Sequence, residues 1–164
     1  LERTIRKLKD GVEDGVPEPD PVLEISVDGY IPDDYIADPR YKLELYRRFA
    51  GLDYAGRGDL LDEIIDRFGE PPEEVEVLWR VACLRALCRL LHIRGISVKQ
   101  GEIRITFAEN AAVDPAALMQ LIGEHQQYMQ FKSGAKAQLI FRTVKLKTDS
   151  LTWLEKNLPR LALD

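Results

Sequence analysis

The clearest pattern of apolar and polar positions lies between residues 59 and 91. Asp59 is a residue type that caps helix N-termini, and the helix it would begin is stopped by Gly69 and the prolines that follow. At about 100° per residue, the apolar positions of this helix share one side and the charged positions share the other. The apolar set is Leu60, Leu61, Ile64, Ile65 and Phe68, and the charged set is Asp62, Glu63, Asp66 and Arg67.

The second half of this stretch, from Val75 to Leu91, is apolar on nearly every side and predicts the buried central helix of a small domain. Its three arginines are expected to reach the surface or a carboxylate. Cys83 and Cys88 lie inside this helix but do not share a face, and no histidine joins them at metal-ligand spacing. We therefore expect two small core residues in a reducing compartment, the cytoplasm, and no metal site.

Alternating positions in the rest of the chain predict short strands. Residues 23–27 form one candidate strand. Residues 96–107 predict a hairpin that turns at Gln100-Gly101, and residues 128–142 predict a second hairpin that turns at Ser133-Gly134.

Further helices are indicated by their first residues. Asp38-Pro39 and Asp114-Pro115 each combine an N-cap with a proline at the first helical position. Either Thr148 or Asp149 caps a terminal helix, whose last turn Pro159 interrupts. The resulting fold class is α+β, with a helical cluster around the central apolar helix packed with a small antiparallel sheet of two β-hairpins.

Composition and charge fit one ordinary globular domain. The 164 residues carry a formal net charge of -5, which disfavours a domain whose main task is to bind nucleic acid. Residues 10–21 are rich in glycine, proline and acids and are interpreted as a linker. Residues 1–9 are interpreted as the tail of a preceding helix and residues 22–164 as the domain. Because the chain begins at Leu1 in a helix-like run, we expect a piece of a longer polypeptide.

Sequence motifs for catalysis are missing. The chain has no phosphate-binding GxxxxGK[ST] loop, and His92 and His125 stand at predicted helix ends without a nucleophile motif nearby. No stretch of 18 apolar residues is present. We expect no enzymatic activity, no catalytic residues, no cofactor, no metal and no membrane association for this chain.

Two surfaces remain open to interpretation. The charged side of the 59–69 helix is either a solvated face with an internal Glu63–Arg67 pair or a contact surface. The basic residues are either solvated or part of a nucleic-acid-binding patch, which would make the chain a small nucleic-acid-binding accessory domain. These residues are Arg40, Lys42, Arg47, Arg48, Lys145 and Lys147.

Two segments resemble the C-terminal domain of the bacterial transcription-repair coupling factor. They are the run DYIxD…RxxLxxYxR over residues 34–48 and the run EIIDRFGxPP over residues 63–72. The second run is the more specific. Phe107-Ala108, Asp114-Pro115 and Trp153 follow in the expected order, so the resemblance covers about residues 20–160.

This resemblance implies a function and a contact surface. The parent protein of the family is an ATP-dependent DNA translocase that displaces stalled RNA polymerase and recruits the excision-repair protein UvrA. Its motor lies upstream, so this chain would be a non-catalytic regulatory domain. In that family the domain docks on the N-terminal UvrB-like domain and masks the UvrA-binding surface. The residues implied in that contact are Glu63, Asp66 and Arg67.

Overall fold

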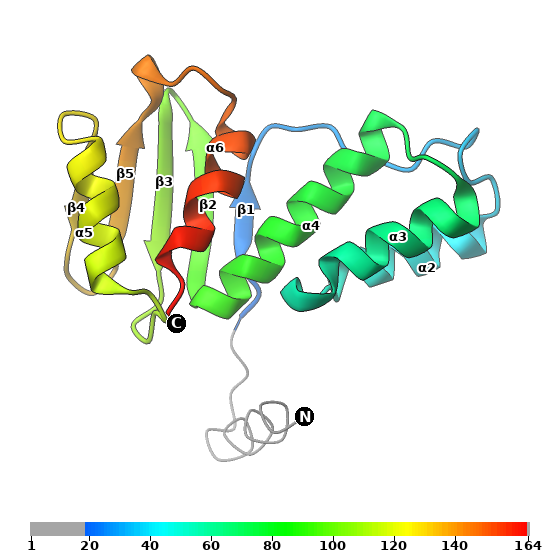
Figure 1. Ribbon diagram of the computed structural model, residues 1–164, viewed down its shortest axis with the longest axis horizontal. Coiled ribbons are helices and arrows are strands. Elements are labelled where there is room, and N and C mark those ends of the chain that lie inside the picture. The colour runs from blue at the N-terminus through cyan, green and yellow to red at the C-terminus, as the bar shows by residue number, and fades with distance from the viewer. Residues whose placement is uncertain (1–18, 164) are drawn as a thin grey trace, which may run out of the picture.

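The computed structural model describes residues 19–163. The predicted helix tail at residues 1–9 and most of the predicted linker at residues 10–21 lie outside the described residues. Within them, five strands form one mixed sheet in the order β1-β2-β3-β5-β4 (Figure 1). The strands are β1 (Val22–Glu24), β2 (Ile93–Lys99), β3 (Glu102–Phe107), β4 (Met129–Lys132) and β5 (Gln138–Arg142).

Both predicted hairpins are confirmed. β2 pairs antiparallel with β3, and Gln100 and Gly101 between them both have positive φ, as a two-residue type I′ turn requires. β4 and β5 form the second hairpin. Antiparallel pairing of β3 with β5 joins the hairpins, and the short β1 adds to β2 in parallel. The sheet is therefore larger than two hairpins alone.

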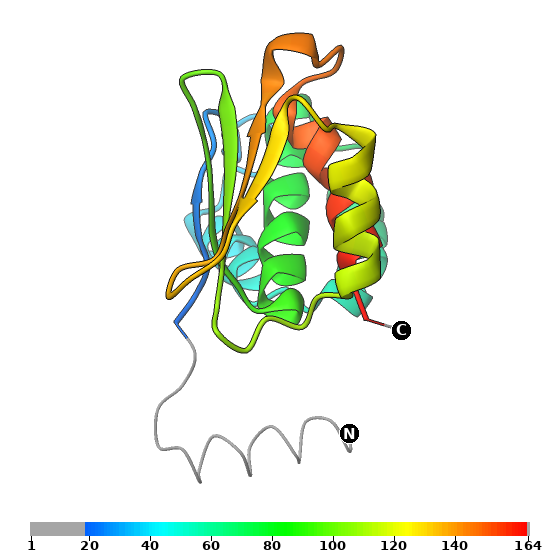
Figure 2. The same ribbon diagram turned by 90° about the vertical axis from the view of Figure 1, so that its left-hand side faces the viewer.

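The helices of the described region lie on one face of the sheet or beyond it. Figure 2 shows α4, α5 and α6 on the same side of the strands, and Figure 1 shows α2 and α3 against the far side of α4. The helices are α2 (Pro39–Ala50), α3 (Arg57–Phe68), α4 (Glu73–Leu91), α5 (Pro115–Glu124) and α6 (Ser150–Asn157). Short 3-10 turns are η1 (Tyr54–Gly56), η2 (Thr143–Lys145) and η3 (Leu158–Leu161).

Two hydrophobic clusters share α4. Leu87 and Leu91, in its C-terminal half, pack with the inner residues of the sheet and with α5 and α6. Val75 and Ala82, in its N-terminal half, pack with α2 and α3. The expected buried central helix is thus confirmed, and so is the α+β fold class.

Most predicted helix ends are correct, with one exception. Asp38 and Asp114 cap α2 and α5 as expected, and Gly69, with φ 89°, ends α3. The prediction that Asp59 caps α3 is wrong, because the helix begins at Arg57 and Asp59 lies in its first turn. The earlier start is held by tertiary contact, since the Trp79 indole N–H donates to the Arg57 carbonyl at 2.9 Å.

Candidate functional site

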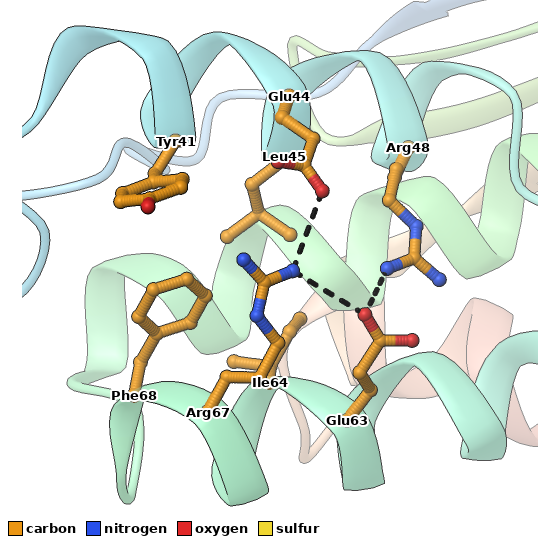
Figure 3. Close-up of a pocket in the computed structure, with 8 residues that line it drawn as sticks. All are labelled: Tyr41, Glu44, Leu45, Arg48, Glu63, Ile64, Arg67 and Phe68. Carbon is orange, nitrogen blue, oxygen red and sulfur yellow. Dashed lines mark hydrogen bonds and ion pairs between the residues drawn. The ribbon is translucent and has the colours of Figure 1, made fainter.

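Charged side chains from α2 and α3 meet in a four-residue cluster at the surface (Figure 3). Glu44 and Arg48 come from α2, and Glu63 and Arg67 come from α3. The Glu63 carboxylate forms ion pairs with Arg48 and, at 3.5 Å, with Arg67. Arg67 also donates to Glu44 Oε1 at 3.3 Å. We call these residues the α2–α3 charge cluster. Its formal charges cancel because it contains two glutamates and two arginines.

Aromatic rings support one end of the cluster. The Arg67 guanidinium carbon lies 4.9 Å from the centre of the Phe68 ring and 5.8 Å from that of Tyr41. Phe68 in turn contacts Tyr35, whose hydroxyl donates to the Gly69 carbonyl at 2.6 Å. Cation–π contacts and ion pairs together fix the position of Arg67 on α3.

Arg48 dominates the electrostatics of Glu63. Its hydrogen bond lowers the pKa of the Glu63 carboxyl below the ordinary value, and Arg67 adds to this effect. Both partners are partly exposed, so the pair is screened by solvent. The cluster is therefore a surface arrangement that holds Glu63 ionised, without the strength of a buried ion pair.

The structure divides the three implied contact residues into two groups. Glu63 and Arg67 turn towards α2 and make the predicted contact with each other. Asp66 is exposed and makes no ion pair or hydrogen bond with any residue between 19 and 163. Asp66 is thus the carboxylate of the three that is available to a partner without breaking an existing contact.

Two surface depressions border the cluster. The first, drawn in Figure 3, overlies Leu45 and Ile64 and has a volume of about 10 Å³, room for about one water molecule. The second has a volume of about 340 Å³ and lies between the end of α2 and the start of α3. Its charged lining residues are Arg47, Arg48, Asp53, Asp59 and Glu63. This lining suits a charged side chain of another protein better than an apolar small molecule.

A family model described as the TRCF domain matches residues 25–118, a span that includes α2, α3 and the charge cluster. The chain belongs to this family. The Bacillus subtilis transcription-repair-coupling factor is 30% identical over 137 residues, which are 81% of this chain and 12% of that protein. The Escherichia coli protein of the same name is 28% identical over 160 residues, covering 95% of this chain and 14% of that protein.

Further matches agree with the family assignment. The transcription-repair-coupling factor of Mycobacterium tuberculosis is 43% identical over 68 residues, covering 41% of this chain and 6% of that protein. A solved structure, the C-terminal domain of a transcription-repair coupling factor, superposes with a TM-score of 0.70 at 22% identity, covering 86% of this chain and 89% of that one. This TRCF domain therefore has the fold of that domain and spans a small part of the relatives' length.

The contribution of α2 to the cluster is not predicted from the sequence. Arg48 is expected to be solvated or part of a nucleic-acid-binding patch, whereas in the structure it is the main partner of Glu63. A signal existed in the helical spacing, because Tyr41, Glu44 and Arg48 follow one another at three and four positions beside the buried Leu45. The spacing shows that these side chains flank the apolar side of α2, but not which helix they meet.

The basic residues of the alternative interpretation do not gather in one patch. Arg40, Lys42 and Arg48 each form an ion pair with an acid of the same domain. Lys145 and Lys147 lie in or after η2, which Figure 1 places at the opposite end of the molecule from α2. The nucleic-acid interpretation thus gains no support from the geometry of the TRCF domain.

Residues that could hold a metal are not clustered in the part of the chain that the structure describes. His92 ends α4, where its Nδ1 lies 2.9 Å from the Asn110 carbonyl oxygen. The His125 ring contacts the Phe141 ring in a tilted arrangement, with a centroid distance of 4.8 Å. None of the helices in residues 19–163 is both long and apolar enough to cross a membrane. Both histidines have structural contacts that account for their positions.

Proposed function

We propose that this TRCF domain is a non-catalytic regulatory domain that docks on the N-terminal UvrB-like domain of its parent protein. Docked there, it would mask the UvrA-binding surface and keep the parent repressed. The parent would be an ATP-dependent DNA translocase that displaces stalled RNA polymerase and recruits nucleotide excision repair. The observation that carries the proposal is the acidic, arginine-supported face of α3, which the family resemblance implies in this contact.

The domain limits form part of the proposal. Residues 22–164 would be the regulatory domain, residues 10–21 the tether and residues 1–9 the end of a helix that leaves the motor module. β1 begins at Val22 and pairs with β2, which supports a domain start at this residue.

The chemistry of the α3 face suits a contact that must also release. Asp66 is exposed, and Glu63 lies on the same side of α3 one turn earlier. Carboxylates of this kind form charge-assisted, bidentate hydrogen bonds with arginines of a partner. Charged contacts at the rim of an interface contribute specificity and association rate more than affinity. A reversible mask needs these properties.

The proposal is tested by binding of the 164-residue chain to the purified UvrB-like domain. Replacing Asp66 with alanine, alone and together with Glu63→Ala, should weaken binding, about tenfold or more for the pair, because each change removes a carboxylate that arginines of the partner require. Isothermal titration calorimetry measures the affinity, and circular dichroism checks that the variants are folded. Glu109→Ala removes one acid from the loop after β3 and serves as the control.

Unchanged binding by the double variant would overturn the assignment of these residues, and no binding by the unaltered chain would overturn the docking itself. In the intact parent protein, the double variant should bind more UvrA and turn over ATP faster, because the mask is released.

A further inference from the structure

Arginines of the domain itself already bind the Glu63 carboxylate, which an arginine of the partner would also have to bind. Glu63 Oε2 accepts hydrogen bonds from the guanidinium groups of both Arg48 and Arg67. A bidentate contact with a third arginine requires both carboxylate oxygens. It would also place a further positive charge beside two others, which is unfavourable. A bidentate contact at Glu63 therefore has to displace one of the two arginines from Oε2.

Arg48 is the partner with fewer other contacts, although its pair with Glu63 is the closer of the two. Arg67 is held on the same helix as Glu63, by Glu44 and by two aromatic rings. Arg48 comes from α2, and Glu63 is its one ion-pair partner among residues 19–163. Removal of Arg48 would leave Glu63 with its 3.5 Å contact to Arg67.

The second depression shows what the removal of Arg48 would change. Arg48 and Glu63 line both depressions, and the larger one also contains Asp53, Asp59 and Arg47. Its charged lining is thus three acids and two arginines. Of these two arginines only Arg48 is ion-paired with Glu63, so its departure, unlike that of Arg47, frees a carboxylate of the lining for a guanidinium group of the partner.

We propose that Arg48 is an internal competitor for docking, which occupies on Glu63 the place of an arginine from the partner and so limits the strength of the mask. This inference rests on the proposed function and adds a regulatory element to the same site. Asp66 makes the first contact, and Glu63 engages only after Arg48 has moved. The domain therefore binds the UvrB-like domain less tightly than it would if Arg48 did not compete for Glu63, and this lower affinity permits release.

The test replaces Arg48 with glutamine, which keeps a hydrogen-bond donor but removes the charge. Binding of the 164-residue chain to the UvrB-like domain should become about two- to fivefold tighter, the range expected for one partly exposed ion pair. Arg47→Gln is the matched control. It removes the same charge from the neighbouring residue of α2, and the Arg47 side chain forms no ion pair among residues 19–163. It should change the affinity by less than Arg48→Gln.

A double-mutant cycle separates competition from a general charge effect. In a chain that already carries Glu63→Gln, the further change Arg48→Gln should give no gain, because no carboxylate remains to be released. A gain of equal size in the Arg47 variant, or in the Glu63→Gln background, would overturn the inference. So would unchanged or weaker binding by Arg48→Gln.

A second readout needs no partner. Carboxyl chemical shifts in the isolated chain should show the Glu63 pKa rising in Arg48→Gln and staying unchanged in Arg47→Gln, because Arg48 is the main cause of its lowered value. If the unaltered chain does not bind the UvrB-like domain, the proposed function fails and the inference fails with it. If the unaltered chain binds and Arg48→Gln binds no better, the inference alone fails.

Discussion

At the scale of single residues, burial decides the chemistry of the two cysteines. Cys88 is fully buried in α4, and Cys83 is partly buried on the same helix. Burial raises the pKa of the Cys83 thiol to about 11 and that of Cys88 to about 12, because a thiolate loses its hydration inside the domain. Both thiols are core residues, as their positions in an apolar helix predict.

The reactivity of these thiols follows from their pKa values. The thiolate is the reacting species, so a pKa of about 11 lowers its fraction at neutral pH by about a hundredfold relative to an exposed cysteine. The native chain at pH 7.5 should react slowly with iodoacetamide, and Cys83 should react before Cys88. Mass spectrometry after timed labelling measures both sites. The urea-denatured chain is the control, and equal rates in the native and denatured chains would contradict the prediction.

At the scale of elements, aspartates cap the N-termini of α2, α5 and α6. Asp149 caps α6, since its side chain accepts from the Thr152 N–H at 2.8 Å and from the Thr152 hydroxyl at 2.9 Å. The backbone hydrogen bond is the main reason that the pKa of Asp149 is lowered. α6 carries Leu151 and Leu154 into the larger hydrophobic cluster. Loss of the cap therefore acts on the core as well as on one helix end.

Asp149→Ala should reduce the free energy of unfolding by about 1 kcal/mol, the usual effect of removing an N-cap. Thr148→Ala is the matched control, because Thr148 is the neighbouring candidate cap and the structure does not use it. Urea unfolding measures both variants. Because the pKa of Asp149 is lowered in the folded state, its ionised carboxylate stabilises the protein at pH values above its unfolded-state pKa. The effect of Asp149→Ala should therefore shrink as the pH falls below about 4. Equal effects of the two variants would contradict the assignment of the cap.

At the scale of the whole molecule, two long-range arrangements hold the domain together. α4 belongs to both hydrophobic clusters, so the α2–α3 layer and the sheet share one helix. β1 pairs in parallel with β2, although α2, α3 and α4 lie between these two strands in the chain. Gly95 permits this pairing, because a Cβ atom there would lie 2.7 Å from the Val22 carbonyl oxygen.

Gly95→Ala should displace β1 and reduce the free energy of unfolding by about 1–3 kcal/mol, because the added methyl group overlaps backbone that cannot move aside without breaking the pairing. Gly58→Ala is the control, since a Cβ on this glycine of α3 meets no atom within 4 Å. The Gly58→Ala variant should be as stable as the unaltered 164-residue chain or slightly more stable. Urea unfolding gives the stabilities, and amide hydrogen exchange reports β1 directly. Unchanged protection of Leu23 in Gly95→Ala would contradict the prediction.

The candidate site was predicted in part. The polar side of α3 follows from helical spacing, and the Glu63–Arg67 contact follows from a separation of four residues. The pairing of Glu63 with Arg48 does not follow, because it joins two helices whose relative placement depends on how both pack on α4. The start of α3 at Arg57 was missed for the same reason, since Trp79 of α4 holds its first turn.

The sequence by itself determined the features that depend on neighbouring residues: the apolar stripes, the aspartate and glycine helix ends, the two hairpin turns and the α+β class. These features follow from local geometry and from the period of each element. Only the tertiary structure decided the joining of the hairpins through β3 and β5, the parallel addition of β1 and the α2–α3 charge cluster. Each of these joins residues far apart in the chain, whose contact depends on packing of the whole domain.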